Sequence, residues 1–331
     1  MGSEAKMQPE LPTMDTCSMK NSMRKALFAL TVVAGLSVCA TAAERIEFTE
    51  QGDFSKFAVR VGVQATRAQC ARVANAVWAD AGDYGAECLR FWAAGFDGQP
   101  VKRALIFFHG DVDDPSDNYL QSSMEKLQAV ADRVAKGQGI PYIFFGRPGT
   151  HGSSGDHMQR RRLQESMLIT VAMDVLKQRF GISEWVVAGQ SGGGHVTASL
   201  LTERSDIVCA VPTSSPSSPS VRYKLRGRTT DMTGYSDSYE PVDFLDRTRM
   251  HPALRVFVLG DPEDRNVVWP SQTVLAERLK AAGVPVSLLT GEGTGPDRHQ
   301  LANSAVIIAS RCTRGESTEE IEARAARGLK G

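Results

Sequence analysis

The sequence predicts an α/β protein whose mostly parallel sheet, of about seven or eight strands, is covered by helices on both faces. Short, continuously apolar runs alternate along the chain with longer segments in which apolar residues recur at helical spacing. Strands separated by helices of this length pair in parallel and are buried on both sides. No internal repeat interrupts this alternation, so a solenoid or propeller is not expected.

The elements follow one another from residue 66 to residue 310. The expected strands are Cys88–Ala94, Ala104–Phe108, Pro141–Phe145, Trp185–Ala188, Ile207–Val211, Arg255–Gly260 and Pro285–Thr290. The expected helices are Thr66–Ala79, Tyr119–Ala135, Met158–Phe180, a segment ending at Leu201, Ser271–Ala282 and Leu301–Ser310.

The N-terminus has the features of an export signal rather than of the fold. After a polar leader of residues 1–18, a basic start at Met19 precedes a short apolar core and a small-residue stretch. We expect cleavage near Ala42 or Ala43, which makes 1–43 leader and signal and 44–331 the mature, periplasmic or secreted domain. The apolar core is short for a membrane span, so an uncleaved anchor is the weaker alternative, as is a lipoprotein attached through Cys39. No stable membrane insertion is expected after cleavage.

The charge balance argues against a nucleic-acid partner. The chain has 38 basic and 38 acidic side chains, and the run Arg160–Arg162 is too short to form a basic patch. Export would instead place four cysteines in an oxidising compartment. Cys70 and Cys88 are the preferred pair, worth about 3 kcal/mol in the chain-entropy model. Cys209 is either a bridge partner or a buried small apolar residue.

One segment breaks the alternation of strands and helices. Residues 212–250 are rich in Ser, Pro, Thr, Arg, Tyr and Asp, which is too polar for a core layer. An insertion at this place can cover a site as a lid. The alternative is a disordered surface loop.

The stretch Trp185–Leu201, WVVAGQSGGGHVTASLL, carries the main functional signal. A strand, the turn G-x-S-x-G from Gly189 to Gly193 and a helix follow one another, an arrangement that presents Ser191 as a nucleophile. Glycine-rich turns between strand and helix also bind phosphate groups, which is the alternative reading.

A nucleophilic serine needs a histidine base and a carboxylate that orients it. On such a turn the partners follow the serine in the order acid, then histidine. His195 lies on the next helix and is expected to be structural, and His251 precedes every candidate acid, which leaves His299 as the base. After the strand Arg255–Gly260, Asp264 is preferred as the acid over Asp261, which precedes a proline and can form a turn; Glu263 is a further alternative.

The oxyanion formed by attack needs backbone donors. We expect one from Gly192 and the other from the turn after Ala104–Phe108, where Asp111 is preferred and Gly110 is the alternative. His109 on this turn is expected to bond the loop rather than act as a second base.

Gln190, Gly110 and Arg147 are the candidate pocket residues. Gln190 could instead bond neighbouring strands. Arg147, in the Gly-, Pro- and Ser-rich stretch 146–157, would either touch an anionic group or fix its loop.

With these residues placed, the chain resembles the α/β-hydrolase superfamily, and within it serine hydrolases related to the prolyl-oligopeptidase catalytic domain and to dienelactone-hydrolase-like esterases. The resemblance covers roughly residues 88–311 and rests on HGD at 109–111, GQSGG at 189–193, GDPED at 260–264 and His299. Two features depart from it. Residues 44–108 are too few for a propeller with blades of about 40 residues, and HGD stands where many esterases have a glycine run.

The sequence therefore predicts an exported serine hydrolase that acts through an acyl-enzyme without a metal or organic cofactor. A small carboxylic ester is the expected substrate, because a site without a propeller is open. A peptidase or amidase acting on short peptides is the first alternative. A non-catalytic binding protein on the same fold is the second.

Overall fold

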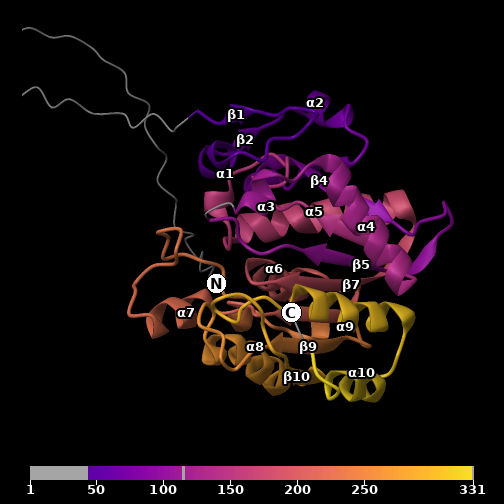
Figure 1. Ribbon diagram of the computed structural model, residues 1–331, viewed down its shortest axis with the longest axis vertical. Coiled ribbons are helices and arrows are strands. Elements are labelled where there is room, and N and C mark those ends of the chain that lie inside the picture. Colours follow the sequence, from indigo (N-terminus) through magenta and orange to yellow (C-terminus); the bar gives the residue numbers. More distant parts are fainter. Residues whose placement is uncertain (1–43, 114–115, 330–331) are drawn as a thin grey trace, which may run out of the picture. The chain divides into compact units, whose positions relative to one another are not determined.

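The computed structural model describes residues 44–113 and 116–329. The predicted leader and signal, 1–43, lie outside the described residues. Within them, the predicted α/β class is confirmed: an eight-stranded, mostly parallel sheet has helices on both faces (Figure 1). Its strand order is β10-β9-β8-β7-β5-β6-β4-β3; β4 pairs antiparallel with both β3 and β6, and the other neighbouring strands pair in parallel. These strands are β3 (Ala76–Asp80), β4 (Ala86–Ala94), β5 (Val101–Phe108), β6 (Tyr142–Phe145), β7 (Ile182–Gln190), β8 (Ile207–Thr213), β9 (Arg255–Gly260) and β10 (Val286–Thr290).

Helices follow most of the strands along the chain, and two short strands form a separate parallel pair. The helices are α1 (Lys56–Val61), α2 (Arg67–Ala71), α3 (Asp117–Leu120), α4 (Met124–Gln138), α5 (Leu163–Phe180), α6 (Gly192–Glu203), α7 (Pro219–Leu225), α8 (Trp269–Ala281), α9 (Ala302–Arg314) and α10 (Thr318–Ala325). The short pair is β1 (Ile46–Glu47) and β2 (Val63–Gln64).

Two apolar cores lie on the two faces of the sheet, because alternate strand residues point to opposite sides. Ile106 on β5 and Val187 on β7 pack in one core, with helices α5, α6 and α8. Leu105 and Val186, their neighbours in sequence, pack in the other, with α4, α9 and α10. The central strands are thus buried on both faces, which explains why they read as continuous apolar runs.

The predicted helix Thr66–Ala79 is wrong over its second half. Helix α2 ends at Ala71, and Ala76–Asp80 forms β3, which pairs with β4. Cys70 of α2 forms a disulfide with Cys88 of β4, which is the pairing that the sequence favoured. The β-rich segment AVWAD gains a full ladder of hydrogen bonds by pairing, which outweighs its helical spacing.

Other differences concern the ends of elements. The expected helix Tyr119–Ala135 is divided into α3 and α4, because the Ser123 side chain accepts a hydrogen bond from the Lys126 backbone and starts a new helix there. Helix α10 and strand β3 were not expected.

Cys209 of β8 forms a disulfide with Cys312 of α9, so it is a bridge partner as well as a buried residue.

Candidate active site

Ser191 lies on a strained turn between β7 and α6. Its backbone has φ 56° and ψ −120°, a left-handed conformation that non-glycine residues rarely adopt outside functional sites. Its N–H donates to the Thr213 carbonyl at 2.8 Å. The motif glycines are required by close packing, since a Cβ at Gly189 would lie 2.1 Å from the Gly193 carbonyl oxygen, and one at Gly193 would lie 2.1 Å from that of Phe108. The turn therefore holds the serine between the ends of adjacent strands.

The structure brings His299 and Asp264 together. His299 Nδ1 lies 2.7 Å from Asp264 Oδ2, and both side chains are buried. The carboxylate accepts three further hydrogen bonds, from the backbone N–H groups of Asn266 (2.8 Å) and Val267 (2.9 Å) and from Gln272 Nε2 (3.1 Å). An ionised carboxylate at this position accepts a hydrogen bond from Nδ1–H and keeps the proton on Nδ1, which leaves the Nε2 lone pair available. His299 Nε2 makes no hydrogen bond within the described part of the chain.

Asp261, the alternative acid, has a different set of partners. Its Oδ2 accepts from the Gly293 backbone (2.8 Å) and from Arg298 Nε (2.9 Å), and its Oδ1 accepts from the Glu263 backbone (2.8 Å). These bonds tie the end of β9 to the loop that carries His299. Asp261 thus braces the loop, whereas Asp264 contacts the imidazole ring.

Gln190, next to the serine, also holds the His299 loop. Its Nε2 donates to the His299 carbonyl at 2.8 Å, and its Oε1 accepts from the Leu301 N–H at 3.0 Å. These two bonds enclose the segment from His299 to Leu301. One buried side chain therefore couples the position of the nucleophile's turn to that of the base.

The turn after β5 lies against the serine. A Cβ at Gly110 would be 3.4 Å from Ser191 Cβ. His109 Nδ1 donates to the Gly110 carbonyl at 2.6 Å, and its Nε2 accepts from the Arg147 N–H at 3.2 Å, so both ring nitrogens are used. Burial holds the pKa of His109 well below its ordinary value. The expected structural role of His109 fits this geometry better than that of a second base.

Asp111 and Gly192, the expected oxyanion donors, are neighbours in space. A Cβ at Gly192 would fall 1.9 Å from Asp111 Oδ1. Neither backbone N–H donates a hydrogen bond to another described residue. Their oxyanion role stays a prediction.

A buried charge cluster neutralises the Asp111 carboxylate beside this turn. Asp111 forms ion pairs with Arg147 (2.9 Å), Arg160 (3.5 Å) and Arg161. Burial alone would raise the pKa of Asp111, but the three guanidinium groups hold it well below its ordinary range. The contact of Arg160 and Arg161 with Asp111 joins residues about 50 positions apart, so spacing along the chain does not predict it.

Arg147, a candidate pocket residue, is not among the residues that line the cavity beside Ser191. Its side chain is fully buried and lies 2.8 Å from Glu165 on α5, in addition to its contact with Asp111. Of the two roles considered from sequence, fixing the loop is the one that agrees with this burial. Arg147 acts as a bridge between the β5 turn and α5.

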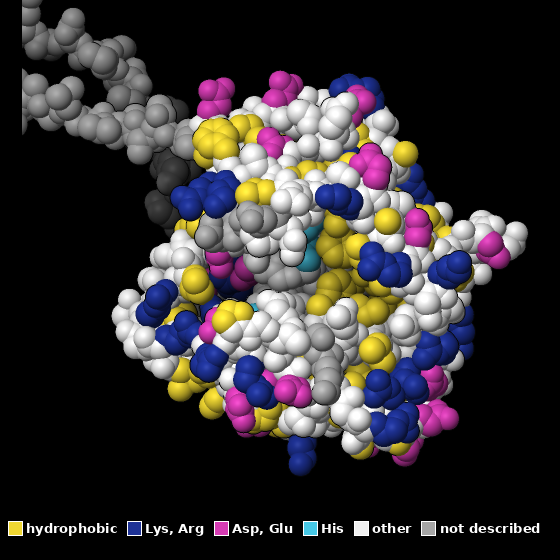
Figure 2. Space-filling model, in the orientation of Figure 1, with side chains coloured by type: hydrophobic (Ala, Val, Ile, Leu, Met, Phe, Trp, Pro, Cys, Tyr) yellow, Lys and Arg dark blue, Asp and Glu magenta, His cyan; other side chains and the backbone are white. Residues whose placement is uncertain are grey.

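A cavity of about 420 Å³ opens beside the serine. The expected site residues Gly110, Asp111, Gln190, Ser191 and His299 all line it. Its walls are largely polar, with side chains that include Asn118, Ser122, His151 and Gln300. Figure 2 shows histidine and charged side chains gathered in a hollow of the molecular surface.

The insertion, 212–250, supplies part of the cavity wall through Pro216, Arg222 and Met232. It is not structureless: it contains α7 and two short 3₁₀ turns, Pro241–Asp243 and Arg247–Arg249. Arg161 Nε donates to Asp231 at 2.8 Å and so fastens the insertion to the body. Opening and closing as a lid stays a prediction.

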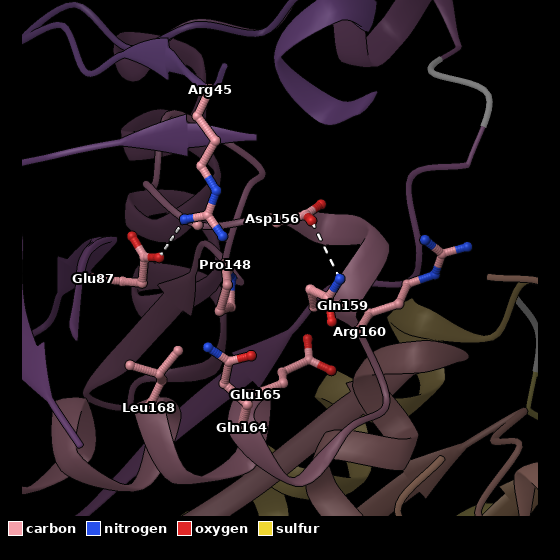
Figure 3. Close-up of a pocket in the computed structure, with 10 residues that line it drawn as sticks. Arg45, Glu87, Pro148, Asp156, Gln159, Arg160, Gln164, Glu165 and Leu168 are labelled. Atoms are coloured by element: carbon pink, nitrogen blue, oxygen red, sulfur yellow. Dashed lines mark hydrogen bonds and ion pairs between the residues drawn. The ribbon is translucent and has the colours of Figure 1, made fainter. Parts of the chain in front are cut away.

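A second cavity, of about 20 Å³, is lined by Glu87, Arg160 and Glu165 among others (Figure 3). It has room for about one water molecule, so it is too small for a substrate.

The residues described in the structure contain no cluster of histidine, cysteine and carboxylate side chains able to hold a metal ion. Among the same residues, no helix is long and apolar enough to cross a membrane.

No protein-family model matches the sequence, and no curated protein matches it. Solved structures do match its fold. Acylaminoacyl peptidase from Pyrococcus horikoshii has a TM-score of 0.52 at 12% identity, covering 74% of this chain and 43% of that one. Prolyl oligopeptidase B from Galerina marginata has a TM-score of 0.52 at 12% identity, covering 72% and 36%. Est1E from Butyrivibrio proteoclasticus, solved with ferulic acid bound, has a TM-score of 0.49 at 14% identity, covering 76% and 99%. At such identities the likeness concerns the fold alone.

Proposed function

We propose that this chain, which has the α/β-hydrolase fold, is an exported serine hydrolase that cleaves a carboxylic ester through an acyl-enzyme. The observation that carries the proposal is the 2.7 Å contact between His299 Nδ1 and Asp264, with His299 and the strained Ser191 lining one cavity. A serine, a histidine and a carboxylate in these relations are the parts of a nucleophilic triad.

In this mechanism Ser191 Oγ attacks the ester carbonyl while His299 Nε2 takes the hydroxyl proton. Asp264 keeps the proton on Nδ1 and stabilises the imidazolium that forms. The N–H groups of Gly192 and Asp111 donate to the oxyanion. The C–O bond then breaks and His299 gives its proton to the leaving alcohol. Water, activated by His299, hydrolyses the acyl-enzyme and restores the serine.

The three arginines around Asp111 have a specific use here. An uncompensated carboxylate beside the oxyanion donors would repel the developing negative charge. Paired with Arg147, Arg160 and Arg161, Asp111 can offer its backbone N–H without that repulsion. This explains how HGD can serve where other esterases have glycines.

A peptidase or amidase acting on short peptides is the second candidate. The two solved structures with TM-scores above 0.5 named above are peptidases, although this chain spans less than half of either. Turnover of an acyl ester compared with that of the amide of the same acyl group separates the two. A kcat/KM for the amide equal to or above that for the ester would favour the peptidase.

Labelling with a fluorophosphonate tests the nucleophile itself. The folded protein should form a stable adduct at Ser191, and the Ser191→Ala protein should form none. A folded wild-type protein that is not labelled would leave the non-catalytic binding protein as the better interpretation.

Export is supported by the signal-like N-terminus and by the two disulfides, which persist in oxidising compartments. Mass spectrometry of the protein from its native host tests it. The mature N-terminus should follow Ala42 or Ala43, and recovery of the uncleaved chain from the cytoplasm would contradict export.

A further inference from the structure

Arg222 is a buried cation at the cavity that contains the serine. It comes from α7 of the insertion, lines the cavity, and is 6% exposed. Its Nη2 donates to Asn266 Oδ1 at 2.7 Å, with a longer contact of 3.5 Å to the Asn266 carbonyl. Its Nε has no hydrogen-bond partner in the described part of the chain.

Asp231, the carboxylate paired with Arg222, lies too far from it to neutralise its charge. Asp231 Oδ1 is 4.0 Å from Arg222 Nη1, whereas Asp231 Oδ2 is bonded directly by Nε and Nη2 of Arg161. Burial, together with the charge of the neighbouring Arg161, lowers the pKa of Arg222 to about 10, so the group stays charged at neutral pH. A buried charge without a close partner is costly, which is the condition that a bound anion relieves.

The surroundings of Arg222 fit an anion better than a cation. Exposed basic residues Lys224, Arg226 and Arg228 follow on the same segment. Arg226 Nη2 donates to the Asn266 carbonyl at 2.7 Å, so it lies beside the Arg222 contact. The acidic wall residues, Asp111 and Asp113, are already paired with arginines.

We propose that Arg222, with Asn266, forms a subsite for a carboxylate carried by the substrate, so that the preferred substrates are esters bearing a free carboxylate. The planar guanidinium offers two parallel donors that match the two oxygens of a carboxylate. This inference rests on the proposed hydrolase function, because it places the subsite in the cavity of Ser191.

Matched pairs of esters test the subsite. One set consists of aryl monoesters of glutaric, adipic and suberic acid with a free distal carboxylate, each paired with its distal primary amide. The other set places the carboxylate, or its amide, on the leaving phenol of an acetate ester. In at least one set the carboxylate ester should have a kcat/KM about 10- to 100-fold higher than its paired amide. This ratio corresponds to the free energy that a charge-assisted hydrogen bond contributes. Equal rates within every pair would overturn the proposal.

Variants assign the preference to a residue. In Arg222→Gln the carboxylate-to-amide ratio should fall to about one, and in Arg222→Lys it should be intermediate, because the charge stays but the paired donors are lost. Arg228→Gln is the matched control: it removes one exposed charge from the same segment and should keep the wild-type ratio. A folded Arg222→Gln protein with the wild-type ratio would refute the assignment.

A binding experiment is independent of turnover and of the stability of Arg222 variants. Calorimetric titration of Ser191→Ala with adipamate, which has one carboxylate, should show tighter binding than with adipamide, which has none. Equal affinity would overturn the subsite even if Ser191 is labelled by a fluorophosphonate. Binding of adipamate by a protein that is neither labelled nor active would instead reject the hydrolase and keep the anion site.

Discussion

Asp264→Asn is the substitution that most directly tests the proposed acid. Asp264 accepts four hydrogen bonds, two from backbone N–H groups to Oδ1 and two, from Gln272 and His299, to Oδ2. An asparagine can place its oxygen against the two backbone donors, and its NH₂ then points at His299 Nδ1. That arrangement stabilises the tautomer with the proton on Nε2, which cannot accept the proton of Ser191.

The expected loss in kcat is about 10⁴-fold, or about 5 kcal/mol of transition-state stabilisation, with a small change in KM. Asp261→Asn is the matched control, since its carboxylate is equally buried and braces the same loop without touching the ring. We expect it to lower kcat/KM by no more than about tenfold, because an asparagine oxygen in place of Oδ2 keeps the hydrogen bonds from Gly293 and Arg298.

Steady-state hydrolysis of an aryl ester, the rate of fluorophosphonate labelling and thermal unfolding of both variants supply the measurements. The reasoning is refuted if folded Asp264→Asn retains most of the wild-type kcat. A loss of several thousandfold in folded Asp261→Asn, with little loss in Asp264→Asn, would transfer the role to Asp261.

Three other predictions follow from the packing around the site. Gly192→Ala should lower kcat about 10²- to 10³-fold, because its Cβ would displace the ion-paired Asp111 carboxylate and disturb the oxyanion donors; a normal kcat would contradict this. Gln190→Leu should reduce kcat more than it raises KM, with partial recovery in Gln190→Glu, which keeps the bond to the Leu301 N–H; unchanged kinetics in Gln190→Leu would show that the coupling is unimportant. Burial lowers the pKa of His195 to about 4, so between that value and about 6.5 only the unfolded state binds the proton, and stability is lost as pH falls through this window. His195 should contribute about 2 kcal/mol of the loss between pH 7 and pH 5, and urea unfolding of His195→Gln should show a correspondingly smaller pH dependence.

The sequence predicted local motifs well because they depend on neighbouring residues. The strand β9 was predicted with its observed ends, since its apolar run follows the charged Arg255 and stops at Gly260, before Asp261 and Pro262. The failure at Ala76–Asp80 has the opposite cause: that segment becomes a strand through pairing with β4, a partner outside any local window.

By itself, the sequence determined the fold class, the turn that carries Ser191 and the order in which a carboxylate and His299 follow it. These depend on periodicity and spacing along the chain. Only the tertiary structure decided that Asp264, rather than Asp261, contacts the His299 ring, that Gln190 holds the His299 loop, and that Arg147 is buried away from the cavity. Such contacts join residues tens of positions apart, and they form because the strand order brings the ends of β5, β7 and β9 to one edge of the sheet.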